Sequence, residues 1–263
     1  MTMNRVVWRI SLTLATAGLV TGLALQPAAA AAPQPVHAPA GGVADPGVVR
    51  TGGNFYAFAT GSRAPVHRGE IASGPWSQLG PALSSVGRWA ASGAVWAPDA
   101  VHTAAGWVLY YSAPAKNFGG QRCIGVAVAN SVSGPYTPYG DSPLICPGGR
   151  HGADDTVPGR PVAGAGVIDP SPFQDSDGNR FVLYKTQQTP STLRMLRVNG
   201  DGTRWVGNTS GELVQRSGII ENPVLVQHGS SYVLFASRYG YNNCSYATVW
   251  LRSSNKWSFS GAT

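Results

Sequence analysis

Charged residues are scarce in this chain of 263 residues. Asp, Glu, Lys and Arg together make up 12% of it, about half of their usual share of about a quarter. Coiled coils and disordered chains need many more charges, so both classes are excluded. Hydrophobic residues make up 43% and aromatic residues 10%, which is enough for a substantial core. The composition therefore indicates a folded globular protein.

Lysine is rarer still. The chain contains only Lys116, Lys185 and Lys256, far apart in the sequence, so its formal net charge of +7 rests mainly on dispersed arginines. Nucleic-acid-binding proteins instead gather their positive residues into a patch or run that follows the phosphate backbone. We therefore expect no nucleic-acid partner.

Long apolar runs are absent except near the N-terminus. Residues 10–25 are uncharged and mostly apolar, they follow two arginines, and small residues stand at 28–30. This order is typical of a secretory signal peptide. The run is shorter than the roughly 20 residues that span a bilayer, so an uncleaved membrane anchor is the less favoured alternative. We predict a signal peptide over 1–30, a linker over 31–44 and a secreted, extracellular mature chain with no membrane partner.

Long helical patterns are also absent, because 34 glycines and 20 prolines interrupt nearly every window that could hold a helix. A unit that occurs four times replaces them: an Xaa-Pro pair, an alternating segment, a turn with glycine, and a strand with aromatic residues. The units begin at Asp45-Pro46, Ala97-Pro98, Asp169-Pro170 and Asn222-Pro223. Such units of about 50 to 70 residues favour an all-β chain folded as a β-propeller. A β-sandwich is the alternative, but it does not require an in-phase repeat.

The residue before each proline has a predictable place in a propeller. Proline lacks an N–H and pushes the preceding residue toward an extended conformation, so each pair should stand where an inner strand begins. Inner strands line the central channel, so Asp45, Asp169 and Glu221 (one position before Asn222) should meet at one rim. The chain has only twelve Asp and Glu, which makes this coincidence informative, although each pair alone could be a surface turn. Converging carboxylates raise the pKa of the most buried one, as hydrolysis of a glycosidic bond requires.

Four segments in this order carry a resemblance to a known family: Asp45-Pro46, VWAPDA at 95–100, VIDPSPFQDSDG at 167–178 and IIENPVLV at 219–226. From about residue 45 to its end the chain resembles glycoside hydrolase family 43, five-bladed propeller enzymes that act on arabinose- and xylose-containing polysaccharides. The resemblance implies an inverting mechanism. Asp45 would be the general base and Glu221 the general acid, and Asp169 would raise the pKa of that acid and orient it. Trp96 would lie near the sugar subsites, with core packing as the alternative.

The resemblance also implies a function. We expect a monomeric hydrolase that releases arabinofuranosyl or xylosyl units from arabinan, arabinoxylan or xylan and requires no cofactor. The sequence does not separate arabinose from xylose specificity, or exo from endo action. A non-catalytic carbohydrate-binding propeller is the alternative. A purely structural propeller is disfavoured by the complete set of three carboxylates.

The number of repeats departs from the family, which has five blades where this chain has four units. The resemblance therefore implies that the propeller domain, residues 45–263, lacks its C-terminal blade. A structural Ca²⁺ on the propeller axis is the one metal that the resemblance implies, and its ligand from the fifth blade would be missing.

Cysteine is scarce, with Cys123, Cys146 and Cys244 only. The segment QRCIGVAVANSVSGPY resembles the second blade of the family, and Cys123 and Cys146 both fall in that unit. Secretion permits a disulfide, so we expect these two to pair and to stabilise the fold by roughly 3 kcal/mol. Two reduced core thiols are the alternative, and Cys244 is left without a partner.

Two further groups could hold a metal ion. Residues 175–179 (DSDGN) resemble the start of a calcium loop but lack its distant Glu, so a hairpin turn is the preferred interpretation. His151, Asp154 and Asp155 could ligate a metal, but a solvated loop is preferred there.

Overall fold

The computed structural model describes residues 43–146 and 165–259, and every regular element in these ranges is a β-strand. The all-β prediction is confirmed. The predicted signal peptide, most of the linker, and His151, Asp154 and Asp155 lie outside the described ranges, which all belong to one compact unit, residues 36–263. Among the described residues, no helix has the length and apolar character needed to cross a membrane.

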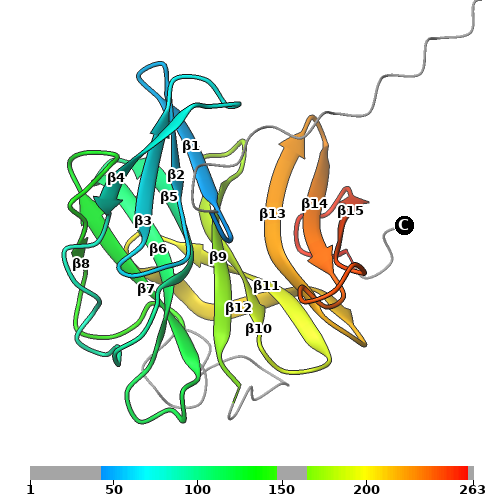
Figure 1. Cartoon of the computed structure of the whole chain (residues 1–263). Coiled ribbons are helices and arrows are strands. Elements are labelled where there is room, and N and C mark those ends of the chain that lie inside the picture. The colour runs from blue at the N-terminus through cyan, green and yellow to red at the C-terminus, as the bar shows by residue number, and fades with distance from the viewer. Residues whose placement is uncertain (1–42, 147–164, 260–263) are drawn as a thin grey trace, which may run out of the picture. The chain divides into compact units, whose positions relative to one another are not determined.

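The described strands form four antiparallel sheets, each made of strands that are consecutive in the chain (Figure 1). The first contains β1 (Gly47–Thr51), β2 (Asn54–Phe58), β3 (Pro65–Gly69) and β4 (Trp76–Pro81). The second contains β5 (Trp96–Thr103), β6 (Gly106–Pro114), β7 (Arg122–Ala129) and β8 (Thr137–Pro138). The third contains β9 (Val167–Gln174), β10 (Arg180–Thr186), β11 (Ser191–Val198) and β12 (Trp205–Arg216). The fourth contains β13 (Ile220–His228), β14 (Ser231–Arg238) and β15 (Ala247–Ser253).

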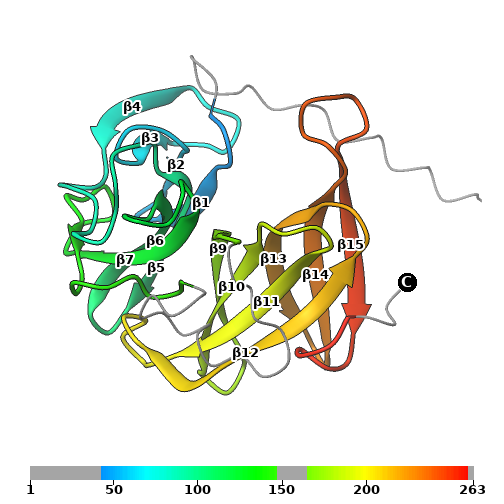
Figure 2. The same cartoon turned by 90° about the horizontal axis from the view of Figure 1, so that it is seen from below.

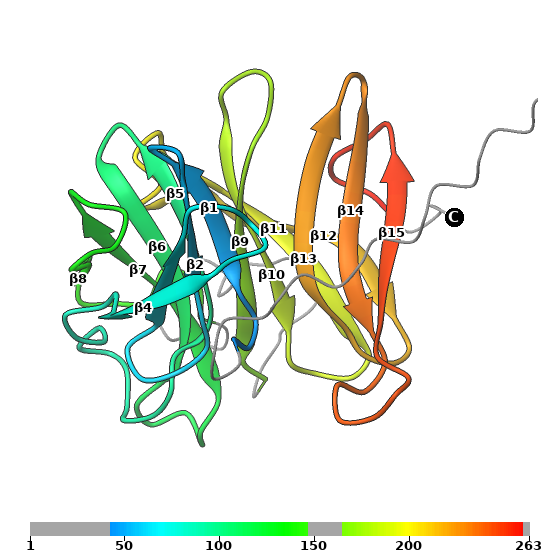
Figure 3. The same ribbon diagram turned by 45° about the horizontal axis from the view of Figure 1, so that its top comes forward.

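Each sheet corresponds to one predicted repeat unit, so the propeller prediction is confirmed for these four blades. The first strands of successive sheets lie beside one another, because β1 contacts β5, β5 contacts β9, and β9 contacts β13. Figures 2 and 3 show these strands on the inner side of the arrangement, with the later strands of each sheet farther out. That the family's fifth blade is absent stays a prediction.

The core fills the spaces between successive sheets. Strand β6 shows how one strand serves two of these spaces, because alternate side chains of a strand point to opposite faces. Leu109 and Tyr111 pack into the cluster shared with the first sheet, whereas Val108 and Tyr110 pack into the cluster shared with the third. A strand buried on both faces is therefore a continuous apolar run, as WVLYY is here.

The conformation expected before each proline is wrong. All four preceding residues have left-handed φ values: 47° for Asp45, 42° for Ala97, 57° for Asp169 and 52° for Asn222. In β5, β9 and β13 the pair lies inside the strand at a register shift, so it forms a bulge instead of beginning the strand. A bulge leaves a position without a ladder partner, which suits a residue that has no N–H. Asp and Asn tolerate left-handed φ better than most residues, which fits three of the four positions.

Two other predictions concern local structure. The structure joins Cys123 to Cys146, so the predicted disulfide is confirmed and the alternative of two reduced thiols is wrong. Among the described cysteines Cys244 is free and exposed.

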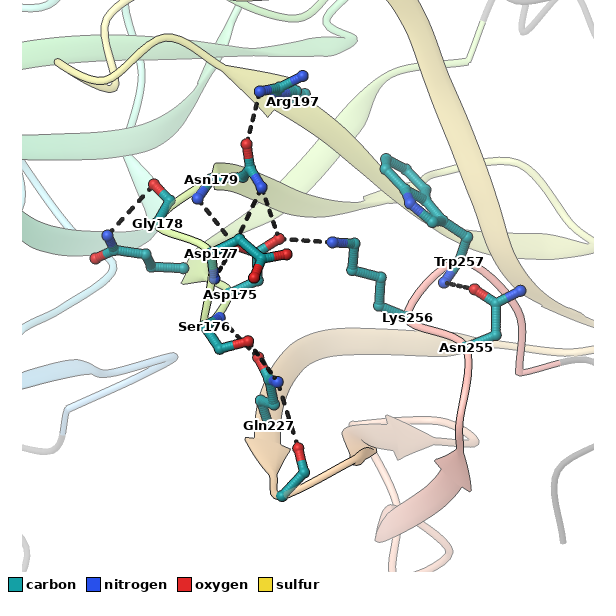
Figure 4. A network of polar contacts seen from close by, with 12 residues as sticks. Asp175, Ser176, Asp177, Gly178, Asn179, Arg197, Gln227, Asn255, Lys256 and Trp257 are labelled. Atoms are coloured by element: carbon teal, nitrogen blue, oxygen red, sulfur yellow. Dashed lines mark hydrogen bonds and ion pairs between the residues drawn. The ribbon is translucent and has the colours of Figure 1, made fainter.

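Residues 175–179 form the turn between β9 and β10, so the hairpin interpretation is confirmed. Asp175 Oδ1 accepts hydrogen bonds from the backbone N–H groups of Asp177 and Asn179, and Lys256 Nζ lies 2.6 Å from Oδ2. Figure 4 shows Lys256 reaching this carboxylate from the segment that follows β15. Both oxygens of Asp175 are therefore taken by protein donors.

Candidate active site

A cavity of about 250 Å³ opens where the inner strands of the four sheets converge. Each sheet contributes an Xaa-Pro pair and the residue that follows it. The lining consists of Asp45, Pro46, Gly47, Ala97, Pro98, Asp99, Asp169, Pro170, Ser171, Asn222, Pro223 and Val224. The four repeated segments, which are far apart in the sequence, therefore meet in one place.

Close packing between β1 and β5 shapes one wall of this cavity. A Cβ atom added to Gly47 would lie 2.4 Å from the carbonyl oxygen of Pro98 and 2.8 Å from Asp99 Oδ1. Any side chain at position 47 would therefore push the first and second blades apart. Glycine at this position holds Asp99 and the neighbouring Asp45 segment against the same cavity.

Asp169 is the buried acid of the cavity, with 8% of its surface exposed. Its Oδ2 accepts a hydrogen bond of 3.0 Å from the backbone N–H of Asn222. Burial raises the pKa of Asp169 to about 7, although the Asn222 hydrogen bond and the charge of Lys185 lower it. The charges of Glu221 and Asp45 raise it further, so all three predicted carboxylates lie within electrostatic range of one another.

Asp45 is the exposed acid. The hydroxyl of Thr60 donates a hydrogen bond of 2.7 Å to its Oδ2, and the same hydroxyl accepts a bond of 2.9 Å from the backbone N–H of Ala97. The second blade therefore fixes the position of an acid that belongs to the first. No described residue forms a hydrogen bond to Asp45 Oδ1.

Glu221 does not line the cavity itself but lies one residue before Asn222, which does. Its side chain is buried between two donors. Lys185 Nζ lies 2.6 Å from Oε2, and the hydroxyl of Tyr246 donates a hydrogen bond of 3.0 Å to Oε1. Tyr246 also accepts a hydrogen bond from the side-chain amide of Asn222, which couples the acid to the cavity wall.

Three residues of this site escaped the sequence analysis. Lys185 carried a signal, since it is one of three lysines and directly follows the apolar run FVLY of its strand. Asp99 stands inside the quoted segment VWAPDA but was given no role. It lines the cavity, and burial raises its pKa to about 7. Tyr246 follows an irregular segment and had no recognisable pattern.

Trp96 stands at the first position of β5, directly before the bulge that lines the cavity. Its side chain is 37% exposed, so the core-packing alternative is wrong. It is not one of the cavity-lining residues, and the Arg122 guanidinium carbon lies 3.4 Å from the centre of its ring.

The described residues do not fit the axial Ca²⁺ that the resemblance implied. Across residues 43–146 and 165–259, no group of three His, Cys, Asp or Glu is placed to hold a metal ion. Of the three predicted acids, Glu221 is paired with the cationic Lys185.

Known proteins share both sequence and fold with this chain. The model of the glycosyl hydrolases family 43 matches residues 34–258. The chain is 29% identical over 176 residues to a probable arabinan endo-1,5-alpha-L-arabinosidase B of Aspergillus fumigatus. The matched region covers 64% of this chain and 45% of that protein. It is 26% identical over 223 residues to the extracellular endo-alpha-(1->5)-L-arabinanase 2 of Bacillus subtilis. The matched region covers 75% of this chain and 45% of that protein. The chain thus spans about half the length of these curated relatives.

Solved structures agree on the fold. A thermostable family-43 glycoside hydrolase superimposes with a TM-score of 0.67 at 19% identity, covering 82% of this chain and 70% of the other. An endo-arabinase from Bacteroides thetaiotaomicron gives a TM-score of 0.67 at 15% identity, covering 84% of this chain and 79% of the other.

Proposed function

We propose, from the premise that this chain belongs to glycosyl hydrolases family 43, that it hydrolyses glycosidic bonds in arabinose-containing polysaccharides, with arabinan as its main substrate. One observation carries the proposal: an exposed acid and a buried acid share one cavity, and a third acid lies directly beside its wall. Two relatives from different organisms bear the name of arabinan-cleaving enzymes, which favours arabinan over xylan.

In the proposed reaction Asp45 is the general base. Water reaches its exposed carboxylate, and Thr60 holds Oδ2 so that Oδ1 can accept a proton. The activated water attacks the anomeric carbon as the bond to the leaving oxygen breaks, and the water proton passes to Asp45. Inversion requires room for this water, so the acid and the base should lie roughly 6.5–9.5 Å apart when substrate is bound.

Glu221 is the general acid in this proposal. Its proton passes to the leaving oxygen, and negative charge develops on its own carboxylate. Lys185 and Tyr246 each lie within hydrogen-bond distance of one oxygen of Glu221, so both stabilise that charge as it forms. Asp169 is the third carboxyl of the proposal: the charge of Glu221 acts on it, so the two side chains interact electrostatically, and Asp169 helps to orient the acid.

Secretion is part of the proposal. The N-terminal segment resembles a signal peptide, and relatives from Bacillus subtilis and Thermotoga petrophila are named as extracellular enzymes. Polymers such as arabinan do not cross membranes, so an enzyme that acts on them works outside the cell. Expression of the full chain in a bacterial host should yield a product in the medium that begins near residue 31.

Hydrolysis of linear arabinan by the purified chain tests the function, with the release of reducing ends as the measurement. Glu221→Gln should lower kcat by roughly 10²- to 10⁴-fold, because it removes the proton donor and keeps the size of the side chain. Glu70→Gln is the matched control, since Glu70 is exposed and lies outside the cavity. Parallel assays on xylan and aryl xyloside test the sugar preference, and NMR of the first product tests inversion.

Two outcomes would contradict the proposal. If the Glu221 variant retains the activity of the wild type, then Glu221 is not the acid. If the wild type binds arabinan without cleaving it, the chain is the carbohydrate-binding propeller that the sequence left as the alternative.

A further inference from the structure

Arg122 occupies an unusual environment at the first position of β7. Only 7% of its surface is exposed, yet no carboxylate of the described residues contacts its side chain. Its described polar partners are two carbonyl oxygens, that of Ala94 at 2.8 Å and that of Ser112 at 3.4 Å, both reached by Nη1. Burial lowers the pKa of Arg122 to about 10.

A buried cation without an acidic partner destabilises a fold, and an apolar side chain of similar length would avoid that penalty. Local choices that work against stability tend to occur where function requires them. The burial of Arg122 therefore indicates a role beyond packing. Its third contact, after the two carbonyl oxygens, indicates what that role is.

That contact is the ring of Trp96. The guanidinium lies 3.4 Å from the ring centre, close enough for direct stacking of the two planar groups. Arg122 covers one side of the indole, while more than a third of the tryptophan surface stays exposed. The guanidinium of Arg122 thus fixes the orientation of the indole ring and leaves part of the ring exposed to solvent.

The backbone around Arg122 is also fixed. Gly166, just before β9, packs so closely that an added Cβ would lie 2.6 Å from the backbone nitrogen of Arg122. The third blade therefore packs against the backbone of Arg122, and the guanidinium of Arg122 packs against the ring of Trp96. Trp96 directly precedes the Ala97 bulge in the cavity wall. Because Trp96 does not line the cavity, a sugar stacked on it lies outside the position of the bond that is cleaved.

We propose that Arg122 is a positioning residue that fixes the Trp96 ring as a stacking platform for a sugar unit of the polymer next to the catalytic cavity. This inference rests on the proposed function for the identity of the polymer. It predicts that Arg122 acts on binding of the chain-like substrate, through Trp96, and not on the proton transfers themselves.

Binding of linear arabinan to the Glu221→Gln chain, measured by affinity gel electrophoresis, tests the proposal without turnover. Trp96→Ala should weaken retention by arabinan. Arg122→Met should weaken it by about threefold to tenfold, and adding Arg122→Met to Trp96→Ala should cause little further loss. Arg204→Met is the control, because Arg204 also lies over a surface aromatic ring, that of Tyr139, at 5.8 Å. It should bind like the parent.

Kinetics on the otherwise unaltered chain give a second readout. In arabinan hydrolysis Arg122→Met should raise KM by a similar factor and change kcat much less, as loss of uniform binding requires. Arg122→Lys keeps the charge but cannot stack as a plane, so it should behave like Arg122→Met. If Arg122→Met does not fold, as judged by circular dichroism, the binding and KM of Arg122→Lys test the inference instead.

Three results would overturn the inference. Binding like the parent by Arg122→Lys would mean that stacking is not needed. Full binding by Trp96→Ala would mean that no sugar contacts the platform. Additive losses in the double variant would mean that Arg122 acts independently of Trp96. The wild type could also fail to hydrolyse arabinan while the binding losses of the Arg122 and Trp96 variants are still not additive. That result would refute the proposed activity but support the role of Arg122 and Trp96 in binding.

Discussion

Titration of Asp169 should make the stability of the protein depend on pH in a window that the structure defines. Burial raises its pKa to about 7, whereas in the unfolded chain an Asp has a pKa of about 3.9. Between these two values the folded state binds a proton that the unfolded state releases. The stabilisation due to this proton is complete at low pH and is lost as the pH rises through about 7.

The size of the effect follows from the two pKa values. The slope in this window is about 1.4 kcal/mol per pH unit for one proton. From about pH 5 to about pH 8, Asp169 should therefore lower the free energy of unfolding by about 2 to 3 kcal/mol, with most of the loss complete near pH 7. Asp99, which also has a pKa of about 7, adds a similar slope, so the wild-type curve alone does not isolate Asp169.

The substitution Asp169→Asn isolates the contribution of Asp169 to the pH dependence of stability. Asparagine keeps an oxygen that can accept the hydrogen bond from the Asn222 N–H, and it removes only the titration. Urea unfolding at several pH values should show the variant gaining about 2 to 3 kcal/mol relative to the wild type between about pH 5 and about pH 8. Asp141→Asn serves as the control, because that side chain is 87% exposed. Curves for wild type and Asp169→Asn that run parallel across this range would refute the account of a buried, protonated Asp169.

Two further variants test the pairing of buried charges. Lys185→Met should lower kcat on arabinan by about 10²-fold, because it removes a cation that stabilises charge on Glu221, and an unchanged kcat would contradict that role. Lys256→Met should destabilise the fold by about 1 to 3 kcal/mol near neutral pH, as measured by urea unfolding, because it removes a partner of the buried Asp175 carboxylate. Burial raises the pKa of Asp175, but hydrogen bonds from Lys256 and Asn179 outweigh burial and hold that pKa below its ordinary value, so this stabilisation should disappear as the pH falls below about 4.

The sequence predicted the blades because their signal is local and repeated. An Xaa-Pro pair, a glycine turn and an aromatic strand occur in each unit, and each unit became one antiparallel sheet. The backbone conformation before proline was mispredicted because the local steric preference for an extended residue gives way to the bulge that the whole sheet imposes.

The partners of Glu221 were beyond sequence reasoning for a different reason. Lys185 and Tyr246 lie 36 and 25 positions away in the chain, and they reach Glu221 only through the packing of neighbouring strands. No spacing rule connects such residues. The disulfide between Cys123 and Cys146 was predictable because both cysteines fall within a single repeat unit.

The four Xaa-Pro segments divide the functions of the site between backbone groups and side chains. Ala97 and Asn222 use their backbone N–H groups as donors, and Asp45 and Asp169 supply the acids that these donors fix. The Ala97 N–H acts through the hydroxyl of Thr60 on Asp45, and the Asn222 N–H acts directly on Asp169. One repeated left-handed conformation thus serves two purposes, since it aims two carboxylates at the cavity and turns two amide groups toward them. A change that straightens either donor bulge should therefore displace an acid in the adjacent blade, even though the acid itself is untouched.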